Sequence, residues 1–229
     1  MAKKTTRAEE NIQAVEEALG KTEQFIEDNQ KPILIVVGVI VLIVLVFFGL
    51  QRFYLVPKEK SAQEQIFMAE YYFEIDSLDL ALNGDGINPG FINIIDDYKF
   101  TLTANLAHYY AGIIYMKKED YQTAIDFLEG FDGDDQIIGP MSLGAIGDCY
   151  LQLDNPNAAV SYYLKAAEVS ENEFTSPVFL MKAGWTYEIL DEYSNAIKIY
   201  KKIKEDFPKS TEAREMEKYI ARAEGKFNS

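Results

Sequence analysis

Hydrophobic residues follow two different patterns along the chain. Residues 33–50 form an uninterrupted apolar run without a charged or polar side chain. As an α-helix, this run would be about 27 Å long, close to the hydrocarbon core of a bilayer, about 30 Å. A core helix of a soluble protein would carry a polar stripe, which this run lacks. We therefore expect residues 32–54 to form one transmembrane helix.

A cleavable signal peptide is the alternative interpretation of the same run. Its eighteen residues exceed the usual apolar region of about 7–15 residues, and the run begins only after 32 other residues. The sequence also lacks a small-x-small cleavage site beside the run. An uncleaved single span is therefore the favoured interpretation.

The segment 1–31 has the pattern of an amphipathic helix. Apolar residues recur every three or four positions from Ala8 to Ile26, and glutamates lie between them. This segment is either a solvated, fraying helix or a docking helix for another protein, because acidic residues disfavour lipid. Five Lys or Arg precede the span, but only two of them lie within twenty residues of it, against three in residues 51–70. The charge therefore does not decide the orientation. We expect the N-terminus inside and the larger domain outside.

Beyond the span, the pattern changes to three longer repeats. Each contains a Gly followed three residues later by Tyr, and the glycines are 35 and 37 residues apart. An Ala follows each Gly after twelve residues, and a bulky residue follows that Ala after four. Small residues let two antiparallel helices approach, and the bulky residue fills the space beside them. The period is typical of the tetratricopeptide repeat (TPR), about 34 residues. The aligned positions are Gly112, Tyr115, Ala124 and Leu128, then Gly147, Tyr150, Ala159 and Tyr163, then Gly184, Tyr187, Ala196 and Tyr200.

The repeats differ in how their second helices begin and end. Tyr121 and Tyr193 precede these helices in the first and third repeats, whereas Pro156 replaces the aromatic residue in the second. Pro208 closes the third repeat, because a proline ends a helix. The second repeat has no such proline, and its extra residues at 171–176 predict a longer loop.

This register predicts an all-α fold, with one N-terminal transmembrane helix followed by a TPR-type α-solenoid and a C-terminal capping helix. The three repeats occupy residues 105–209, and the capping helix occupies 210–229. Residues 55–104 hold a degenerate first repeat and a connecting loop, with helices expected near 59–76 and 91–97. The loop LNGDGINPGF between these helices lacks the ligand spacing of an EF-hand.

The candidate binding surface is the concave face formed by the first helix of each repeat. Met and Tyr dominate there, and such residues make an adaptable apolar groove for a hydrophobic segment. The alternative is that neighbouring helices cover several of these residues, which are then core. These positions hold no Lys or Asn, so they do not form the basic, Asn-bearing clamp of chaperone-binding TPR domains. The candidate positions are Leu106, Tyr109, Ile113, Met116, Met141, Gly144, Asp148, Leu151, Val178, Met181, Thr186 and Ile189.

Composition and charge exclude several classes of function. The net charge of −15 argues against binding to nucleic acid or to anionic lipid. One Cys and one His exclude most metal sites, disulfide frameworks and Cys/His nucleophile pairs. His108 is expected to pack in a first helix, and Cys149 to be a buried small hydrophobe. We expect no enzyme activity, no cofactor and no metal.

Two segments resemble a known family. The order of an amphipathic stretch, one span and a TPR domain resembles the YfgM-type ancillary subunit of the Sec translocon, and so does FIEDNQKPI at the start of the span. ALNGDGINPGF followed by NLAHYYAGIIY resembles a subgroup of anchored TPR proteins of Bacteroidetes. The resemblance implies a single-pass protein of the bacterial inner membrane with a periplasmic C-terminal domain. It also implies contacts with translocon subunits, exported client polypeptides and a periplasmic chaperone.

Other functions stay open on the sequence alone. A cytosol-facing anchored TPR receptor and a general envelope-assembly scaffold fit the same architecture. No motif supports a membrane-anchored hydrolase. All of these hypotheses place residues 33–50 in the lipid bilayer.

Overall fold

The computed structural model describes residues 24, 27–133 and 135–228. The chain divides into two compact units, Met1–Pro57 and Lys58–Ser229. The amphipathic helix predicted for residues 1–31 lies almost entirely outside the described residues.

A long helix contains the apolar run. Helix α2 (Gln30–Leu50) continues through a π-helical turn (Gln51–Leu55) into α3 (Val56–Glu74). The whole helix, Gln30–Glu74, has 45 residues, and its apolar part is exposed along its length. By length and composition, this helix could cross a membrane.

The π turn coincides with a proline inside the helix. The N–H of Val56 donates to the carbonyl of Gln51, five residues earlier, and Pro57 follows directly. A proline in a helix removes one hydrogen bond and clashes with the preceding turn, and a π turn there changes the local geometry. The helix expected near 59–76 is therefore not a separate element. It begins as a continuation of the apolar helix and ends at Glu74.

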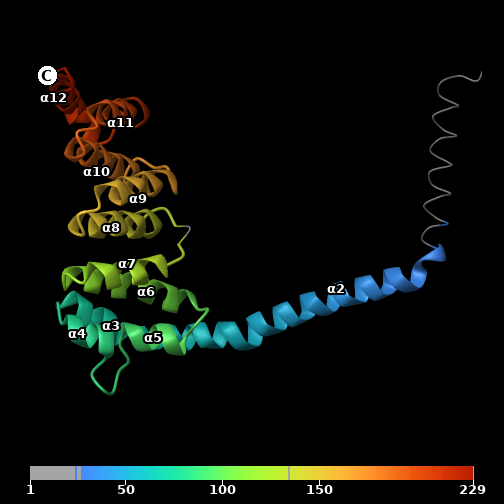
Figure 1. The fold of residues 1–229 in the computed structure, drawn as a ribbon. Helices are drawn as coiled ribbons and strands as arrows, with labels where there is room; N and C mark the ends of the chain where they lie inside the picture. Colours follow the sequence, from blue (N-terminus) through green and yellow to red (C-terminus); the bar gives the residue numbers. More distant parts are fainter. Residues whose placement is uncertain (1–23, 25–26, 134, 229) are drawn as a thin grey trace, which may run out of the picture. The chain divides into compact units, whose positions relative to one another are not determined.

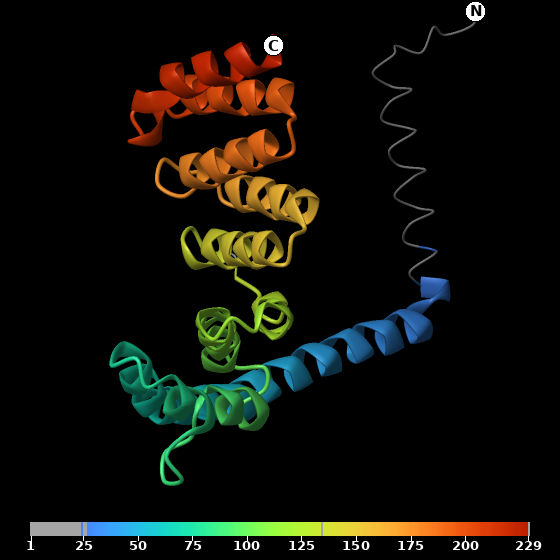
Figure 2. The same ribbon diagram turned by 60° about the vertical axis from the view of Figure 1, so that its left-hand side comes forward.

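The second unit is a stack of helices. Figures 1 and 2 show them following one another in chain order up to the C-terminal helix. Helix α5 has the bounds expected from the sequence, whereas α4 was not expected as a separate helix. The elements are α4 (Leu78–Asn83), α5 (Phe91–Asp97), α6 (Leu102–Lys117), α7 (Tyr121–Glu129), α8 (Ile138–Gln152), α9 (Pro156–Glu168), α10 (Ser176–Ile189), α11 (Tyr193–Asp206), a 3-10 turn (Glu212–Glu215) and α12 (Met216–Phe227).

The repeat glycines lie where the paired helices touch. A Cβ atom at Gly147 would come within 2.6 Å of Cε1 of Tyr163, and one at Gly184 within 2.3 Å of Cε1 of Tyr200. Both tyrosines are fully buried. The predicted pairing of a small residue with a bulky one is therefore confirmed. It sets how closely α8 approaches α9 and α10 approaches α11.

The same turn joins the two helices of each repeat. Its acidic residue has a positive φ: 62° at Glu119, 56° at Asp154 and 58° at Asp191. The turn between α3 and α4 has the same form, with φ 58° at Asp76. In all four turns an N–H donates to the carbonyl of a tyrosine five residues earlier. The donors and acceptors are Ser77 and Tyr72, Asp120 and Tyr115, Asn155 and Tyr150, and Glu192 and Tyr187.

Helix α12 closes the stack. Its residues Met216, Ile220 and Ala223 are buried in the same core cluster as Tyr200 and Ile203 of α11. Its other positions are mostly polar and exposed. The capping helix expected for residues 210–229 therefore begins with a 3-10 turn and becomes α-helical at Met216.

Candidate binding groove

A groove of about 380 Å³ lies across the first helices of the three repeats. Residues spaced by three and four positions on α6 and α8 line it, together with α10 and the loop before α10. This spacing places them on one face of each helix. The lining residues, which together we name the candidate binding groove, are Tyr109, Ile113, Met116, Met141, Ala145, Asp148, Phe174, Thr175, Val178, Phe179 and Lys182.

The structure brings together six of the residues proposed from the sequence: Tyr109, Ile113, Met116, Met141, Asp148 and Val178. They come from three different repeats. Met141 and Val178 keep 44% and 36% of their surface exposed, so neighbouring helices do not cover them. Part of the predicted concave face is therefore an open surface and not core.

The other proposed residues lie elsewhere. Leu106 lines a separate cavity beside α3, and Ile189 lines one near α12. Leu151 and Met181 are half-buried and pack against the C-terminal core cluster. Gly144 is buried, and a Cβ there would meet the ring of Phe179 at 1.9 Å.

Thr186 is not part of any accessible surface. It is 1% exposed, and its Oγ1 donates to the carbonyl of Lys182 at 2.8 Å. The groove-facing residues Ile113 and Asp148 each follow the repeat glycine directly, so the equivalent residue of the third repeat is Trp185. Trp185 is 42% exposed and lines the cavity near α12. Its position directly after the repeat glycine would have identified Trp185 from the sequence.

Sequence reasoning also missed a charged pair in the groove. The Nζ of Lys182 lies 2.7 Å from both carboxylate oxygens of Asp148. The hydroxyl of Tyr163 donates to Oδ1 of the same carboxylate at 2.6 Å. The ammonium also lies over the ring of Phe179, at 5.9 Å from its centroid. A lysine is therefore present in the groove, but its charge is compensated by Asp148.

Burial shifts the pKa values of three side chains, one each on α6, α8 and α9, toward their neutral forms. Burial raises the pKa of the Tyr163 hydroxyl, and its hydrogen bond to Asp148 raises it further. Burial raises the pKa of the Cys149 thiol to about 11, and the charge of Asp148 acts in the same direction. Because the thiolate is the reactive form, Cys149 is unreactive at neutral pH. Burial also lowers the pKa of His108, whose Nδ1 is buried without a hydrogen-bond partner.

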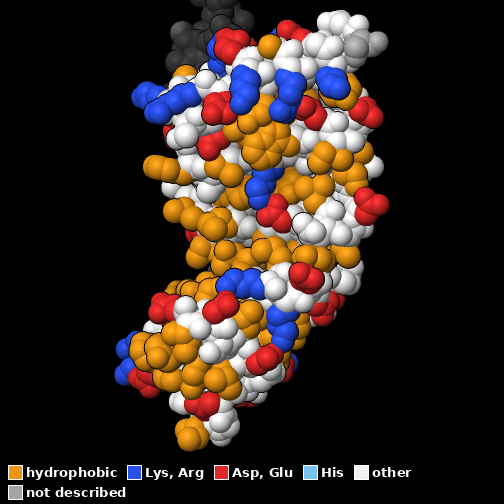
Figure 3. All heavy atoms as spheres, turned by 90° about the vertical axis from the view of Figure 1, so that its left-hand side faces the viewer, with side chains coloured by type: hydrophobic (Ala, Val, Ile, Leu, Met, Phe, Trp, Pro, Cys, Tyr) orange, Lys and Arg blue, Asp and Glu red, His pale blue; other side chains and the backbone are white. Residues whose placement is uncertain are grey.

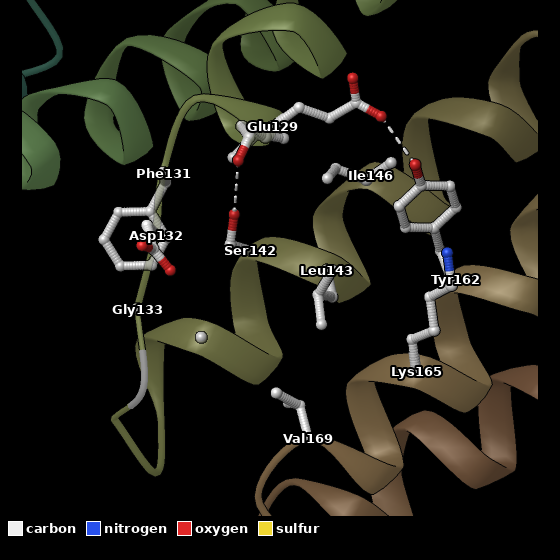
Figure 4. A pocket seen from close by; sticks show the side chains of 12 residues that line it. Glu129, Phe131, Asp132, Gly133, Ser142, Leu143, Ile146, Tyr162, Lys165 and Val169 are labelled. Carbon is white, nitrogen blue, oxygen red and sulfur yellow. Dashed lines mark hydrogen bonds between the residues drawn. The ribbon is translucent and has the colours of Figure 1, made fainter.

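A second cavity, of about 470 Å³, lies between α7, α8 and α9 (Figure 4). The two hydroxyl groups that line it bond to neighbours within the protein. The hydroxyl of Tyr162 donates to Glu129 at 2.7 Å, and that of Ser142 donates to the carbonyl of Leu128 at 3.3 Å. The Nζ of Lys165 lies 4.6 Å from the ring centroid of Tyr162. None of the proposed groove residues lines this cavity. Among the described residues, no group of His, Cys, Asp and Glu could hold a metal ion.

Hydrophobic and charged side chains are unevenly distributed over the surface of the second unit, Lys58–Ser229. Figure 3 shows hydrophobic side chains spread over the middle of one face. Lys and Arg side chains gather toward the upper end of the same view, over the C-terminal helices. The fold and the groove together define a TPR-type α-solenoid, a class of protein–protein interaction scaffold.

Comparison with known proteins supports this class. Two tetratricopeptide repeat family models match residues 142–173 and 179–210, the second and third of the repeats found in the sequence. These two segments of the chain are therefore tetratricopeptide repeats.

A solved structure of TPR-like repeats shows the same fold. One similar crystal structure is a Podosopora anserina chain of nearly identical TPR-like repeats, with a TM-score of 0.55 and 11% identity. The match covers 74% of this chain and 88% of that chain. Two crystal structures of MamA have TM-scores of 0.40 and 0.44, at 21% and 17% identity. They cover 60% and 75% of this chain, and 89% and 88% of their own. The chain matches none of the curated proteins with which it was compared.

Proposed function

We propose that the protein is a membrane-anchored adaptor that binds an apolar segment of a partner polypeptide in the candidate binding groove. One observation carries this proposal. Apolar and aromatic side chains from three repeats line one continuous groove. Among the described lining residues, the charged ones are Asp148 and Lys182, which compensate each other. Such a surface favours apolar side chains, because no uncompensated charge has to lose its water.

The apolar run would hold this adaptor at a membrane. Residues 33–50 are uncharged, and their helix buries none of its apolar window against the rest of the protein. An exposed apolar helix of this length is stable in lipid rather than in water. Carbonate extraction of membranes that contain the full chain should leave it in the pellet. Release into the supernatant would contradict the anchor.

The compartment and the partners rest on the resemblance in sequence. On that basis we propose a bacterial inner-membrane protein with its repeat unit in the periplasm. It would act as an accessory subunit of the Sec translocon, contacting translocon subunits, exported clients and a periplasmic chaperone. A cytosol-facing receptor and a general envelope-assembly scaffold are the alternatives. Protease treatment of spheroplasts tests the compartment, because a periplasmic repeat unit is digested and a cytosolic one is protected. A pull-down in mild detergent that recovers no translocon component would contradict the translocon role.

The groove can be tested with one matched pair of variants. Met141 and Leu153 are 44% and 42% exposed on the same repeat, but only Met141 lines the groove. The full chain, reconstituted in lipid nanodiscs, is titrated with a fluorescent apolar peptide. A carboxylate in an apolar site costs several kcal/mol, so Met141→Glu should weaken binding by about tenfold or more. Leu153→Glu should leave it unchanged. Equal binding by both variants would contradict the proposed site.

A further inference from the structure

The net charge of residues 102–229 changes sign along the chain. Residues 102–192 contain four Lys or Arg and fifteen Asp or Glu, a net charge of −11. Residues 193–229 contain nine Lys or Arg and six Asp or Glu, a net charge of +3. The helices that line the groove therefore belong to the acidic part of the chain.

Three of the four lysines of this acidic part are paired with carboxylates of the protein. Lys117 pairs with Asp76 at 2.9 Å, and Lys118 pairs with Asp79. Lys182 is held by Asp148 inside the groove. These ammonium groups are occupied by acids of the protein itself, so they are not free to attract an acidic partner.

Acidic side chains lie around the groove. Asp135 precedes α8, and its charge raises the pKa of Tyr109, a groove residue that burial affects more strongly. Partial burial works against ionisation of Asp135, but N–H groups of Ile137, Ile138 and Gly139 bond its carboxylate and lower its pKa. Glu171 and Glu173 do not line the groove, but they are exposed in the loop that supplies its residue Phe174, and the charge of Glu171 also acts on Lys202 of α11. Phe174 is itself 82% exposed.

We propose that the groove selects segments in which a few large apolar side chains are flanked by Lys or Arg. This inference rests on the proposed function and names the chemistry of the segment that would bind. The apolar side chains contact the groove, whose own charge is compensated. The flanking cations lie over the surrounding acidic loops. A segment flanked by Asp or Glu meets like charges there and is disfavoured, which is how charge complementarity produces specificity.

Two peptides with the same apolar core test this inference. One carries Lys residues on both sides, and the other carries Glu at the same positions. Both are labelled and titrated against the full chain in uncharged nanodiscs, at low salt and at about 1 M salt, where charge interactions are screened beyond about 3 Å. At low salt, the Lys-flanked peptide should bind at least about tenfold more tightly. At high salt, the two affinities should converge.

A pair of variants locates the source of the preference. Glu171→Lys/Glu173→Lys should reduce the preference for the Lys-flanked peptide by about threefold or more. Glu64→Lys/Glu205→Lys makes the same charge change at exposed positions away from the groove, and should leave the preference unchanged. An equal effect of both double variants would overturn the placement of the basic flanks over the 171–173 loop.

The outcomes separate this inference from the proposed function. If both peptides bind equally at low salt, and Met141→Glu weakens both, the charge preference is refuted while the groove stands. If Met141→Glu weakens neither peptide, the groove itself is refuted and the inference with it.

Discussion

At the residue scale, contacts between glycine and tyrosine determine how closely the helices of a repeat approach. Gly184 is buried, and the nearest neighbour of a Cβ there would be the ring of Tyr200. That ring cannot move easily, because Tyr200 is fully buried and its hydroxyl donates to Glu188 at 2.5 Å. Interiors packed at this density transmit added volume as strain.

Gly184→Ala should therefore destabilise the protein. The added methyl group forces α10 and α11 apart, and overpacking of this kind costs about 1–3 kcal/mol. The free energy of unfolding from urea denaturation measures the effect. Gly225→Ala is the matched control, because a Cβ at Gly225 in α12 meets no atom within 4 Å. That variant should be neutral or more stable, since alanine favours a helix by about 0.5–1 kcal/mol. Equal stability of both variants would show that the close contact has no energetic role.

Cys149 should make the free energy of unfolding depend on pH in the alkaline range. Its thiol is buried, and its pKa in the folded protein is about 11, against an ordinary value of 9.0. A raised folded-state pKa stabilises the protein below the unfolded pKa, and this contribution is lost as the pH rises toward 11. Between pH 9 and 11, the thiol contributes a decrease of at most about 1.4 kcal/mol per pH unit. Cys149→Ala should therefore show a shallower decline than the parent chain in urea denaturation at stepped pH. Identical slopes would contradict the assignment.

At the element scale, the three complete repeats could be predicted because their signals are local. Each Gly, Ala and bulky residue stands at a fixed spacing, and helix geometry converts that spacing into contacts. The pair formed by α3 and α4 has a weaker signal. Ala69, Tyr72 and Ala81 keep the spacing of the other repeats, but alanine replaces the glycine and Asp85 stands at the bulky position. Both alanines are fully buried, so the packing is retained where the sequence pattern is lost.

The groove could be predicted only in part, because only some of its residues stand at a fixed spacing from the repeat glycine. Counting positions on either side of the repeat glycine predicts the groove residues of α6 and α8 except Ala145. In the second half of α10, the predicted positions lie one residue too far along the chain, so Thr186 was predicted instead of Trp185. The contact between Lys182 and Asp148 joins residues 34 positions apart, and it depends on how α10 packs against α8. A single helix pattern contains no information about such a contact.

Side-chain caps mark the beginning of three repeat helices, α6, α7 and α9. The side chain of Asn155 accepts a hydrogen bond from the N–H of Ala158 at the start of α9. Asn155→Ala removes this bond and should lower the free energy of unfolding by about 1 kcal/mol. Asn157→Ala, at an exposed position inside the same helix, should have no effect or stabilise slightly, because alanine has the higher helix propensity. Thermal unfolding followed by circular dichroism compares the two. A larger loss for Asn157→Ala would rule out the cap.

At the scale of the whole molecule, a stack of repeats leaves an apolar face open at each end unless a helix covers it. At the C-terminal end, α12 covers α11 with Met216, Ile220 and Ala223, all of them buried. The residues beneath it, Tyr200 and Ile203, are fully buried as well. Burial of this kind contributes about 25 cal/mol for each Å² of apolar surface removed from water.

Ending the full chain after Lys209 should therefore expose the last repeat. The truncated protein should bind a hydrophobic dye such as ANS and unfold at lower urea than the parent chain, because its terminal core contacts water. Ending the chain after Lys226 removes Phe227, which is 60% exposed, and leaves the buried face of α12 in place. This shorter truncation should match the parent chain in both measurements. If both truncations unfolded at the parent's urea concentration, the array would be stable without its last helix, and α12 would not act as a cap.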